Sequence, residues 1–146
     1  MLKIICVGKI KEKYLNDLID DYKLRISKYQ KIEIIELKDS NKIKENEEIL
    51  KVLNEKDFNI CMDIKGNKIN SLELSKLIDK TYTNGYSTIT FIIGASEGLT
   101  EEVKNKCNYK LSFSDLTFPH GLFRGILLEQ IYRSFKILNN ESYHKW

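Results

Sequence analysis

The sequence of 146 residues is long enough for one domain, and its 42% hydrophobic and 31% charged residues are ordinary for a soluble globular protein. The formal net charge of +3 permits a nucleic-acid partner but does not argue for one. The apolar run at the N-terminus is too short for a signal peptide or a membrane span. We therefore expect a cytoplasmic protein without membrane contact.

The chain contains three widely spaced cysteines, Cys6, Cys61 and Cys107, and no CxxC or Cys/His cluster. This pattern predicts reduced thiols and no metal site. Cys6 and Cys61 also lie inside apolar runs that predict strands, where cysteine behaves as a small hydrophobic residue.

The first half of the chain alternates between strand and helix patterns. The continuous apolar run 2–7 predicts a strand that is buried on both faces. Apolar residues at helical spacing over 15–29 predict an amphipathic helix, and the alternation in 31–37 predicts a second strand. Residues 38–57 are rich in charge but have one apolar face, which predicts a surface helix.

Residues 58–64 predict a third strand, and Gly66-Asn67 predicts a turn at its end. A helix is expected to follow and to end at Asn84-Gly85. Either residue of the pair Asn70-Ser71 can cap it, and Asn70 with Glu73 resembles a capping box.

Residues 87–93 are rich in β-branched side chains and predict a fourth strand. The strand runs into the loop 94–99 (GASEGL), and a short helix capped by Thr100 follows. The loop is neither a P-loop nor a GxGxxG motif, so its glycines indicate either a tight turn or close approach to a ligand. The alternation of strands and helices predicts an α/β fold, a mainly parallel sheet with helices on both faces, in a single domain of residues 1–146.

The next segment combines a strand at 109–113, a polar loop at 114–117, the chain's only proline (Pro119) and a helix from Leu122 to Asn139-Asn140. Open α/β sheets bind ligands beyond the carboxyl ends of their strands, at βα corners of this kind. We therefore expect the functional site here.

His120 and Arg124 are the candidate site residues of this corner, and they lie one helical turn apart. The pair would suit an anion such as phosphate or carboxylate. His120 could be a general base, a hydrogen-bond donor or a helix-start residue. Arg124 could instead form a salt bridge, to Glu129 or Glu97.

Polar and aromatic residues near the C-terminus form a second candidate region. Arg133 and Lys136 could contact a phosphate backbone or form a solvated helix face. The tail after the helix holds Tyr143 and His144, which either fray with the terminus or meet a partner.

Five segments of the chain resemble the small bacterial SPOUT-class rRNA methyltransferases. The resemblance is to the family that N3-methylates pseudouridine 1915 in helix 69 of 23S rRNA, and it spans nearly the whole chain. The segments, in order, are ICVGKIKEKY (5–14), FIIGASEGL (91–99), LSFSDLTFPH (111–120), LLEQIYRSFKI (127–137) and YHK (143–145).

The resemblance implies a C-terminal trefoil knot, S-adenosylmethionine as a cofactor bent within it, a homodimer with its sites near the interface, and 23S rRNA in the ribosome as the substrate. The candidate catalytic residues are His120, Arg124, Tyr143 and His144, chosen by side-chain chemistry: the two histidines can accept a proton, and Tyr143 could stack on a base. By motif, the residues expected to bind the cofactor are Met62, Gly94, Phe113, Ser114, Asp115, Leu116, Thr117 and Phe118.

The chain departs from the family pattern at three positions. Ala95 stands where the family usually has a second glycine, Ser142 stands where a proline is common, and Trp146 extends the tail. An alanine at position 95 would tighten the cofactor pocket slightly.

The last helix carries more apolar residues than one stripe requires, including Leu128 and Tyr132, which predicts an obligate homodimer. Two other functions stay open. One is a nucleotide- or cofactor-binding α/β enzyme of another reaction class. The other is a ribosome-associated factor without catalysis, which Ala95 weakly favours.

Overall fold

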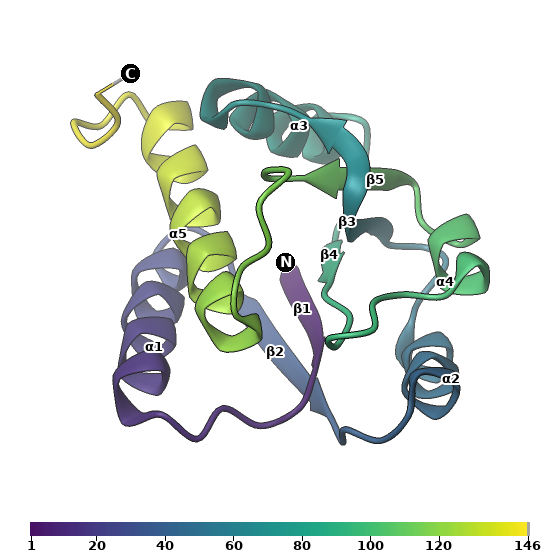
Figure 1. Cartoon of the computed structure of the whole chain (residues 1–146). Helices are drawn as coiled ribbons and strands as arrows, with labels where there is room; N and C mark the ends of the chain where they lie inside the picture. The colour runs from purple at the N-terminus through teal and green to yellow at the C-terminus, as the bar shows by residue number, and fades with distance from the viewer. Residues whose placement is uncertain (146) are drawn as a thin grey trace.

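The computed structural model describes residues 1–145, which form one parallel five-stranded sheet with five helices around it (Figure 1). The strand order is β2-β1-β4-β3-β5. The elements in chain order are β1 (Leu2–Val7), α1 (Lys13–Ser27), β2 (Ile32–Leu37), α2 (Lys42–Val52), β3 (Phe58–Lys68), α3 (Ser71–Thr83), β4 (Ile89–Ile92), α4 (Glu101–Asn105), β5 (Tyr109–Ser112) and α5 (His120–Leu138).

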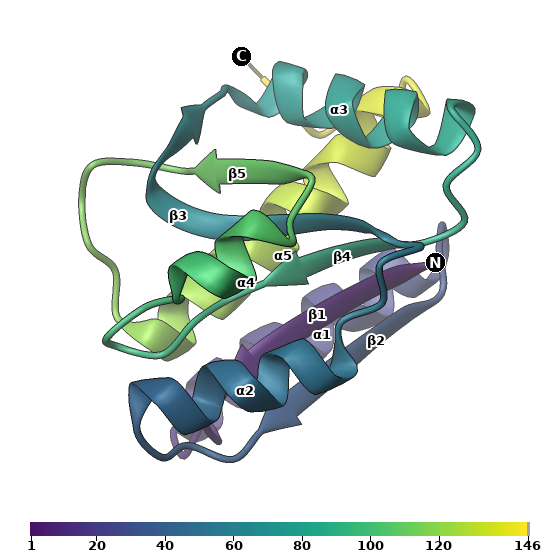
Figure 2. The same ribbon diagram turned by 90° about the vertical axis from the view of Figure 1, so that its right-hand side faces the viewer.

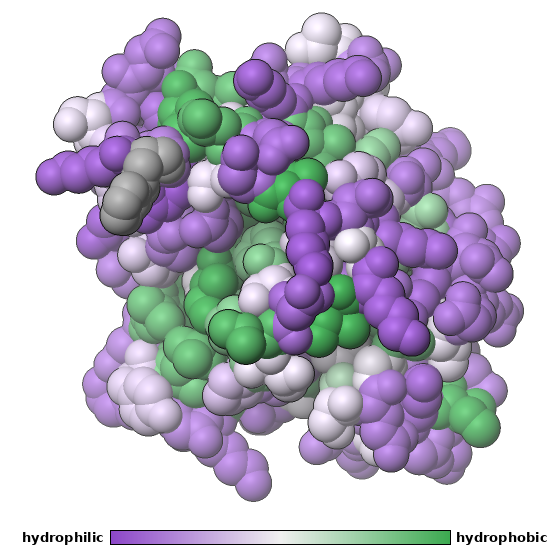
Figure 3. Space-filling view, turned by 45° about the horizontal axis from the view of Figure 1, so that its top comes forward, coloured by the Kyte–Doolittle hydropathy of each residue, from purple (hydrophilic) through white to green (hydrophobic). Residues whose placement is uncertain are grey.

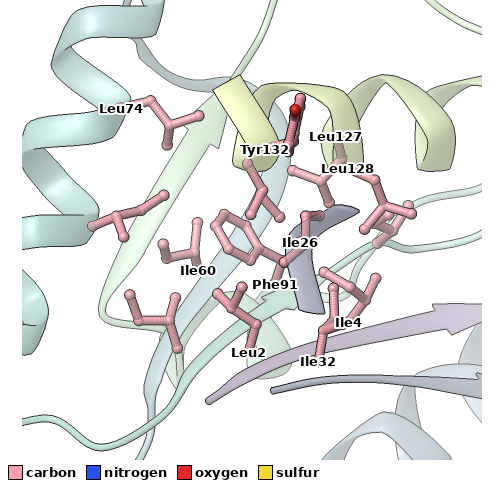
Figure 4. Packing of buried hydrophobic residues seen from close by; sticks show 14 of the residues in the cluster. Leu2, Ile4, Ile26, Ile32, Ile60, Leu74, Phe91, Leu127, Leu128 and Tyr132 are labelled. Atoms are coloured by element: carbon pink, nitrogen blue, oxygen red, sulfur yellow. The ribbon is translucent and has the colours of Figure 1, made fainter. Parts of the chain in front are cut away.

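The sheet is covered on both faces, as the sequence predicts. Helices α1, α3 and α5 pack on one face, where Figure 4 shows Leu127 and Leu128 of α5 beside Phe91 of β4. Helices α2 and α4 cover the other face through Ile49 and Val103. Strand β1 serves both cores because alternate side chains of a strand point to opposite faces.

Side-chain caps set the first residues of three helices. Asn70 and Glu73 form the expected capping box at α3, with bonds of 2.8 and 3.0 Å. Thr100 caps α4 as expected. Asn41 caps α2 by accepting from the amide of Lys44 at 2.9 Å, so this helix begins at Lys42 and not near residue 38.

The turn expected at Gly66-Asn67 is wrong, because β3 continues through it to Lys68. The strand bulges between Met62 and Asn67 and then pairs again with β5, curving away from the sheet in Figure 2. A Cβ on Gly66 would lie 2.7 Å from the carbonyl carbon of Lys110. The glycine therefore permits close contact of two strands and does not mark a turn.

Smaller differences affect the ends of three elements. β4 spans Ile89–Ile92 rather than 87–93, and β5 ends at Ser112 rather than 113. Helix α5 begins at His120 rather than Leu122, with Pro119 as its N-cap residue. The imidazole of His120 therefore belongs to the first turn of a long helix, not to the preceding loop.

The apolar surplus of α5 is used inside the chain. Leu128 is fully buried and Tyr132 is 7% exposed, both in the core beneath α1 and α3. Leu128 and Tyr132 therefore do not support a dimer interface, since a helix that packs between two others needs a wide apolar surface. The threading of the chain into a knot stays a prediction.

Cys6, Cys61 and Cys107 are free thiols. Burial raises the pKa of Cys6 to about 11. Among residues 1–145, no helix is long and apolar enough to cross a membrane, and no three potential metal ligands of the His, Cys, Asp and Glu types group together.

Candidate functional site

A cavity of about 440 Å³ lies at the carboxyl ends of β3, β4 and β5. Three segments contribute its lining: residues 62–64 at the bulge of β3, the loop after β4, and the β5–α5 loop with the first turn of α5. The two loops run close to each other below the strand ends in Figure 1. The cavity is thus at the βα corners where the sequence predicts a ligand site.

Seven of the eight residues expected to bind the cofactor line this cavity: Met62, Gly94, Phe113, Ser114, Leu116, Thr117 and Phe118. Asp115 is the exception. Its carboxylate points to solvent and pairs with Lys68 at 2.5 Å. The side chain lies on the outer surface of a loop whose other face forms the cavity wall.

The loop after β4 is folded tightly on itself. The amide of Gly98 donates to the carbonyl of Ala95 at 2.8 Å, and Gly98 adopts a positive φ of 81° that favours glycine. A Cβ on Gly94 would lie 2.9 Å from the carbonyl carbon of Gly98. Ala95 lines the cavity and also packs against the core beneath α2 and α4. Both glycines are therefore required by the loop itself.

The cavity wall is mainly apolar and includes one carboxylate. Asp63 lies at the bulge of β3, where it accepts from the amide of Lys65 at 3.1 Å and pairs with Lys104 of α4 at 3.3 Å. Hydroxyl groups are supplied by Ser112 and Thr117 among others. An apolar pocket with a few convergent polar groups is typical of sites for small organic ligands.

His120 lines the cavity and binds the end of β1. Its Nε2 lies 2.6 Å from the carbonyl oxygen of Val7. A carbonyl oxygen only accepts, so Nε2 carries a proton and Nδ1 is the acceptor nitrogen of the neutral ring. His120 can therefore anchor α5 and still offer a proton acceptor at Nδ1.

Arg124 is almost fully buried and does not line the cavity. Its guanidinium pairs with Glu36 of β2 at 2.6 Å and donates to the carbonyl of Gly8 at 3.1 Å. The partners Glu129 and Glu97 that the sequence suggested are wrong. Glu36 lies 88 residues away, and local spacing carries no information about such a contact.

Replacing Glu36 by glutamine is expected to lower the free energy of unfolding by about 2 kcal/mol, because the buried guanidinium of Arg124 loses its counter-charge. The estimate stays below the value for a fully buried pair because 38% of the Glu36 side chain is exposed. Urea unfolding measures the change. Glu33→Gln, on an exposed position of the same strand, is the control and should unfold like the parent protein; equal stability of both variants would show that the pair contributes nothing.

The C-terminal tail is packed against α5. The hydroxyl of Tyr143 donates to Glu129 at 2.9 Å, and its ring meets that of Tyr132 edge-on at 5.0 Å. The guanidinium of Arg133 lies 4.7 Å above the Tyr143 ring and 3.1 Å from Nδ1 of His144. Burial, together with hydrogen bonds to Tyr22 and Glu129, raises the pKa of Tyr143. The tail is thus packed against α5 as far as His144.

The basic residues Arg133 and Lys136 pair with carboxylates, Glu129 at 3.1 Å and Glu141 at 2.9 Å. Because arginine only donates, Nδ1 of His144 is the acceptor in its contact with Arg133, and Nε2 carries the proton. That Nε2 is buried and has no hydrogen-bond partner among residues 1–145.

The tail follows the C-terminal end of α5, and the β5–α5 loop that lines the cavity leads into its N-terminal end (Figure 1). The helix has 19 residues and is therefore about 28 Å long at the standard helical rise. Tyr143 and His144 are not among the residues that line the cavity. The four candidate catalytic residues therefore do not meet within one chain.

Several lining residues were missed by the sequence analysis, including Asp63, Ser96, Gly98 and Phe123. Gly98 and Ser96 belong to a loop whose glycines indicated either a tight turn or close approach to a ligand. Nothing local marked Asp63, because the bulge that turns it toward the cavity depends on pairing with β5.

Sequence comparison relates the chain to one family along its length. A family model described as "Predicted SPOUT methyltransferase" matches residues 1–144. A protein of Clostridium botulinum (strain Kyoto / Type A2) named "Ribosomal RNA large subunit methyltransferase H" is 52% identical, and the alignment covers 99% of each chain. A Clostridium perfringens (strain SM101 / Type A) protein named "Ribosomal RNA large subunit methyltransferase H 1" is 48% identical with the same coverage.

Solved structures support the fold. A probable methylase family protein from Haemophilus influenzae Rd KW20 superposes with a TM-score of 0.59 at 13% identity, covering 99% of this chain and 70% of that one. The SpoU methyltransferase AviRb from Streptomyces viridochromogenes, in complex with AdoMet, has a TM-score of 0.50 at 10% identity, covering 91% and 57%. These structures share the fold of the chain, and the matches of sequence along its length decide the family. The chain belongs to the SPOUT methyltransferase family.

Proposed function

We propose that this protein transfers the methyl group of S-adenosylmethionine to N3 of pseudouridine 1915 in helix 69 of 23S rRNA. The observation that carries the proposal is the cavity at the ends of β3, β4 and β5, which collects seven of the eight residues that the family resemblance assigns to the cofactor. The full-length similarity to proteins named ribosomal RNA large subunit methyltransferase H supports an rRNA substrate.

The cavity fits S-adenosylmethionine in size and chemistry. A volume of about 440 Å³ lies within the usual range for sites of small organic ligands. Phe113 and Phe118 offer apolar surface to an adenine ring, and Asp63 offers a negative charge to a cationic ligand. When bound, the cofactor supplies a methyl group activated by its sulfonium.

The residues of the chain would position the methyl donor and the acceptor base, and one of them would accept the N3 proton. Most of the catalysis of an in-line displacement comes from holding donor and acceptor in line. The N3–H of the acceptor must lose its proton, and His120, which lines the cavity, has Nδ1 as its acceptor nitrogen. The bond from His120 to Val7 would hold the ring in place during the transfer.

A homodimer and the knotted topology belong to the same proposal. Ile64 and Leu116 line the cavity and are 48% and 71% exposed, and Leu122 next to it is 36% exposed. Figure 3 shows hydrophobic residues exposed among hydrophilic ones on the surface of the molecule. A second copy would cover such residues. It would also double the positive net charge available to bind RNA, which is only +3 per chain. The substrate would place the protein in the cytoplasm.

Mass spectrometry of helix 69 from cells lacking this protein tests the substrate. The methyl group on pseudouridine 1915 should be absent, and a plasmid copy of the gene should restore it. Calorimetry with the purified protein tests the cofactor, since S-adenosylmethionine should bind while NAD and ATP should not. Binding of NAD or ATP instead would favour another reaction class, and binding to ribosomes without the cofactor would favour a non-catalytic factor.

A further inference from the structure

One side chain of α2, Asn46, holds the loop after β4 from the side away from the cavity. The residue is 3% exposed. Its Nδ2 donates to the carbonyl of Lys42 in its own helix at 2.8 Å and to the carbonyl of Gly98 at 3.3 Å. Its Oδ1 accepts from the amide of Thr100 at 2.9 Å. The amide group therefore bridges the backbone on both sides of Leu99.

The bonds of Asn46 reach the cavity wall through Gly98. Gly98 lines the cavity, and its amide closes the turn on Ala95. Gly94 packs so tightly against Gly98 that an added Cβ would lie 2.9 Å from its carbonyl carbon. A displacement of Gly98 would therefore change the shape of the cavity beside Gly94.

We infer that Asn46 is a positioning residue for the cofactor, which fixes the loop 94–99 in the shape that binds S-adenosylmethionine. The role requires a donor toward Gly98 and an acceptor toward Thr100 at once, which a side-chain amide provides and a carboxylate does not. The residues around it, Glu45, Glu47 and Glu48, are all acidic. The inference rests on the cofactor assignment of the proposed function.

Asn46→Asp tests the inference because it keeps the size of the side chain and the acceptor for Thr100 but loses the donor. The ionised carboxylate would also set a negative oxygen against the carbonyl of Gly98. We expect the dissociation constant for S-adenosylmethionine to rise at least about tenfold by calorimetry, the cost of one lost hydrogen bond and an added repulsion. The KM for the cofactor should rise while kcat at saturating cofactor stays near the parent value.

Ile49→Val is the matched control. Ile49 is fully buried one turn further along α2, in the same core cluster as Leu99, and makes no polar contact with the loop. This variant should lower the melting temperature and leave cofactor affinity unchanged. If the two variants lose affinity equally, or if Asn46→Asp binds the cofactor like the parent protein, the inference is overturned. If the parent protein itself does not bind S-adenosylmethionine, the proposed function fails instead.

Discussion

Replacing Gly94 by valine is expected to abolish binding of S-adenosylmethionine, with a loss of affinity of at least about a hundredfold. The sequence suggested that a side chain here would meet the ligand. The structure adds a nearer obstacle, because the new Cβ would lie 2.9 Å from the carbonyl carbon of Gly98 and 3.1 Å from the amide nitrogen of Leu99. Both are backbone atoms, so the loop itself must move.

Calorimetry measures the loss, and circular dichroism checks that Gly94→Val is folded. Gly85→Ala is a suitable control. Gly85 lies in the turn after α3 with a φ of 101°, and an added Cβ would meet no atom within 4 Å. The control should lose about 1 kcal/mol of stability through backbone strain and keep its cofactor affinity. Near-parent affinity in Gly94→Val would contradict a cofactor site at this loop.

Removal of residues 143–146 is expected to lower the rate of rRNA methylation at least about tenfold, equivalent to roughly 1.4 kcal/mol of transition-state stabilisation. An aromatic ring, an imidazole and a cation suit an unstacked base and its phosphate. Cofactor affinity should stay unchanged, because the tail does not line the cavity of its own chain. Trp146 lies outside the described residues, so the role is assigned to Tyr143 and His144.

Substitutions separate contact with RNA from the packing of the tail. His144→Ala should reproduce much of the loss. Tyr143→Phe should retain more activity than the truncation, since it keeps the ring against Tyr132 and Arg133 and removes only the hydroxyl and its hydrogen bonds. Sedimentation of each variant should give the same mass as the parent protein. A truncated protein that methylates at the normal rate would leave His120 as the one histidine to consider.

The length of α5 makes a sharper version of this experiment possible. Because about 28 Å of helix separates the tail from the cavity of the same chain, we expect the tail to act at the cavity of a second copy in the proposed dimer. Gly94→Val has a damaged cavity and an intact tail, whereas the truncated protein has the reverse. In the proposed dimer, random pairing of the two variants in equal amounts should give up to about a quarter of the parent activity. No recovery would mean that tail and cavity do not cooperate between chains.

Much of the fold was predictable because its determinants are local. The unbroken apolar run of β1 predicted a strand buried on both faces, and the pair Asn70 and Glu73 predicted where α3 begins. Alternation of such elements is enough to predict a parallel sheet with two covered faces. Most of the segments that line the cavity were also named from the sequence, although by resemblance to a family and not by their chemistry.

The errors share one physical cause, which is that they concern contacts between distant segments. Gly66 is of a residue type common in turns, but here it allows β5 to lie close to β3. Leu128 and Tyr132 exceed the single apolar stripe that a helix on one face of a sheet requires, yet α1 and α3 cover them.

Hydrophobic periodicity and capping act within a few residues, so the order of strands and helices and the caps of α3 and α4 could be predicted from the sequence. Long-range packing sets which polar groups face the cavity. It buried Arg124 against Glu36, turned Asp63 inward and set the tail at the far end of α5. These placements depend on the register of paired strands and on the packing of helices across the sheet, which bring together residues that no local pattern relates.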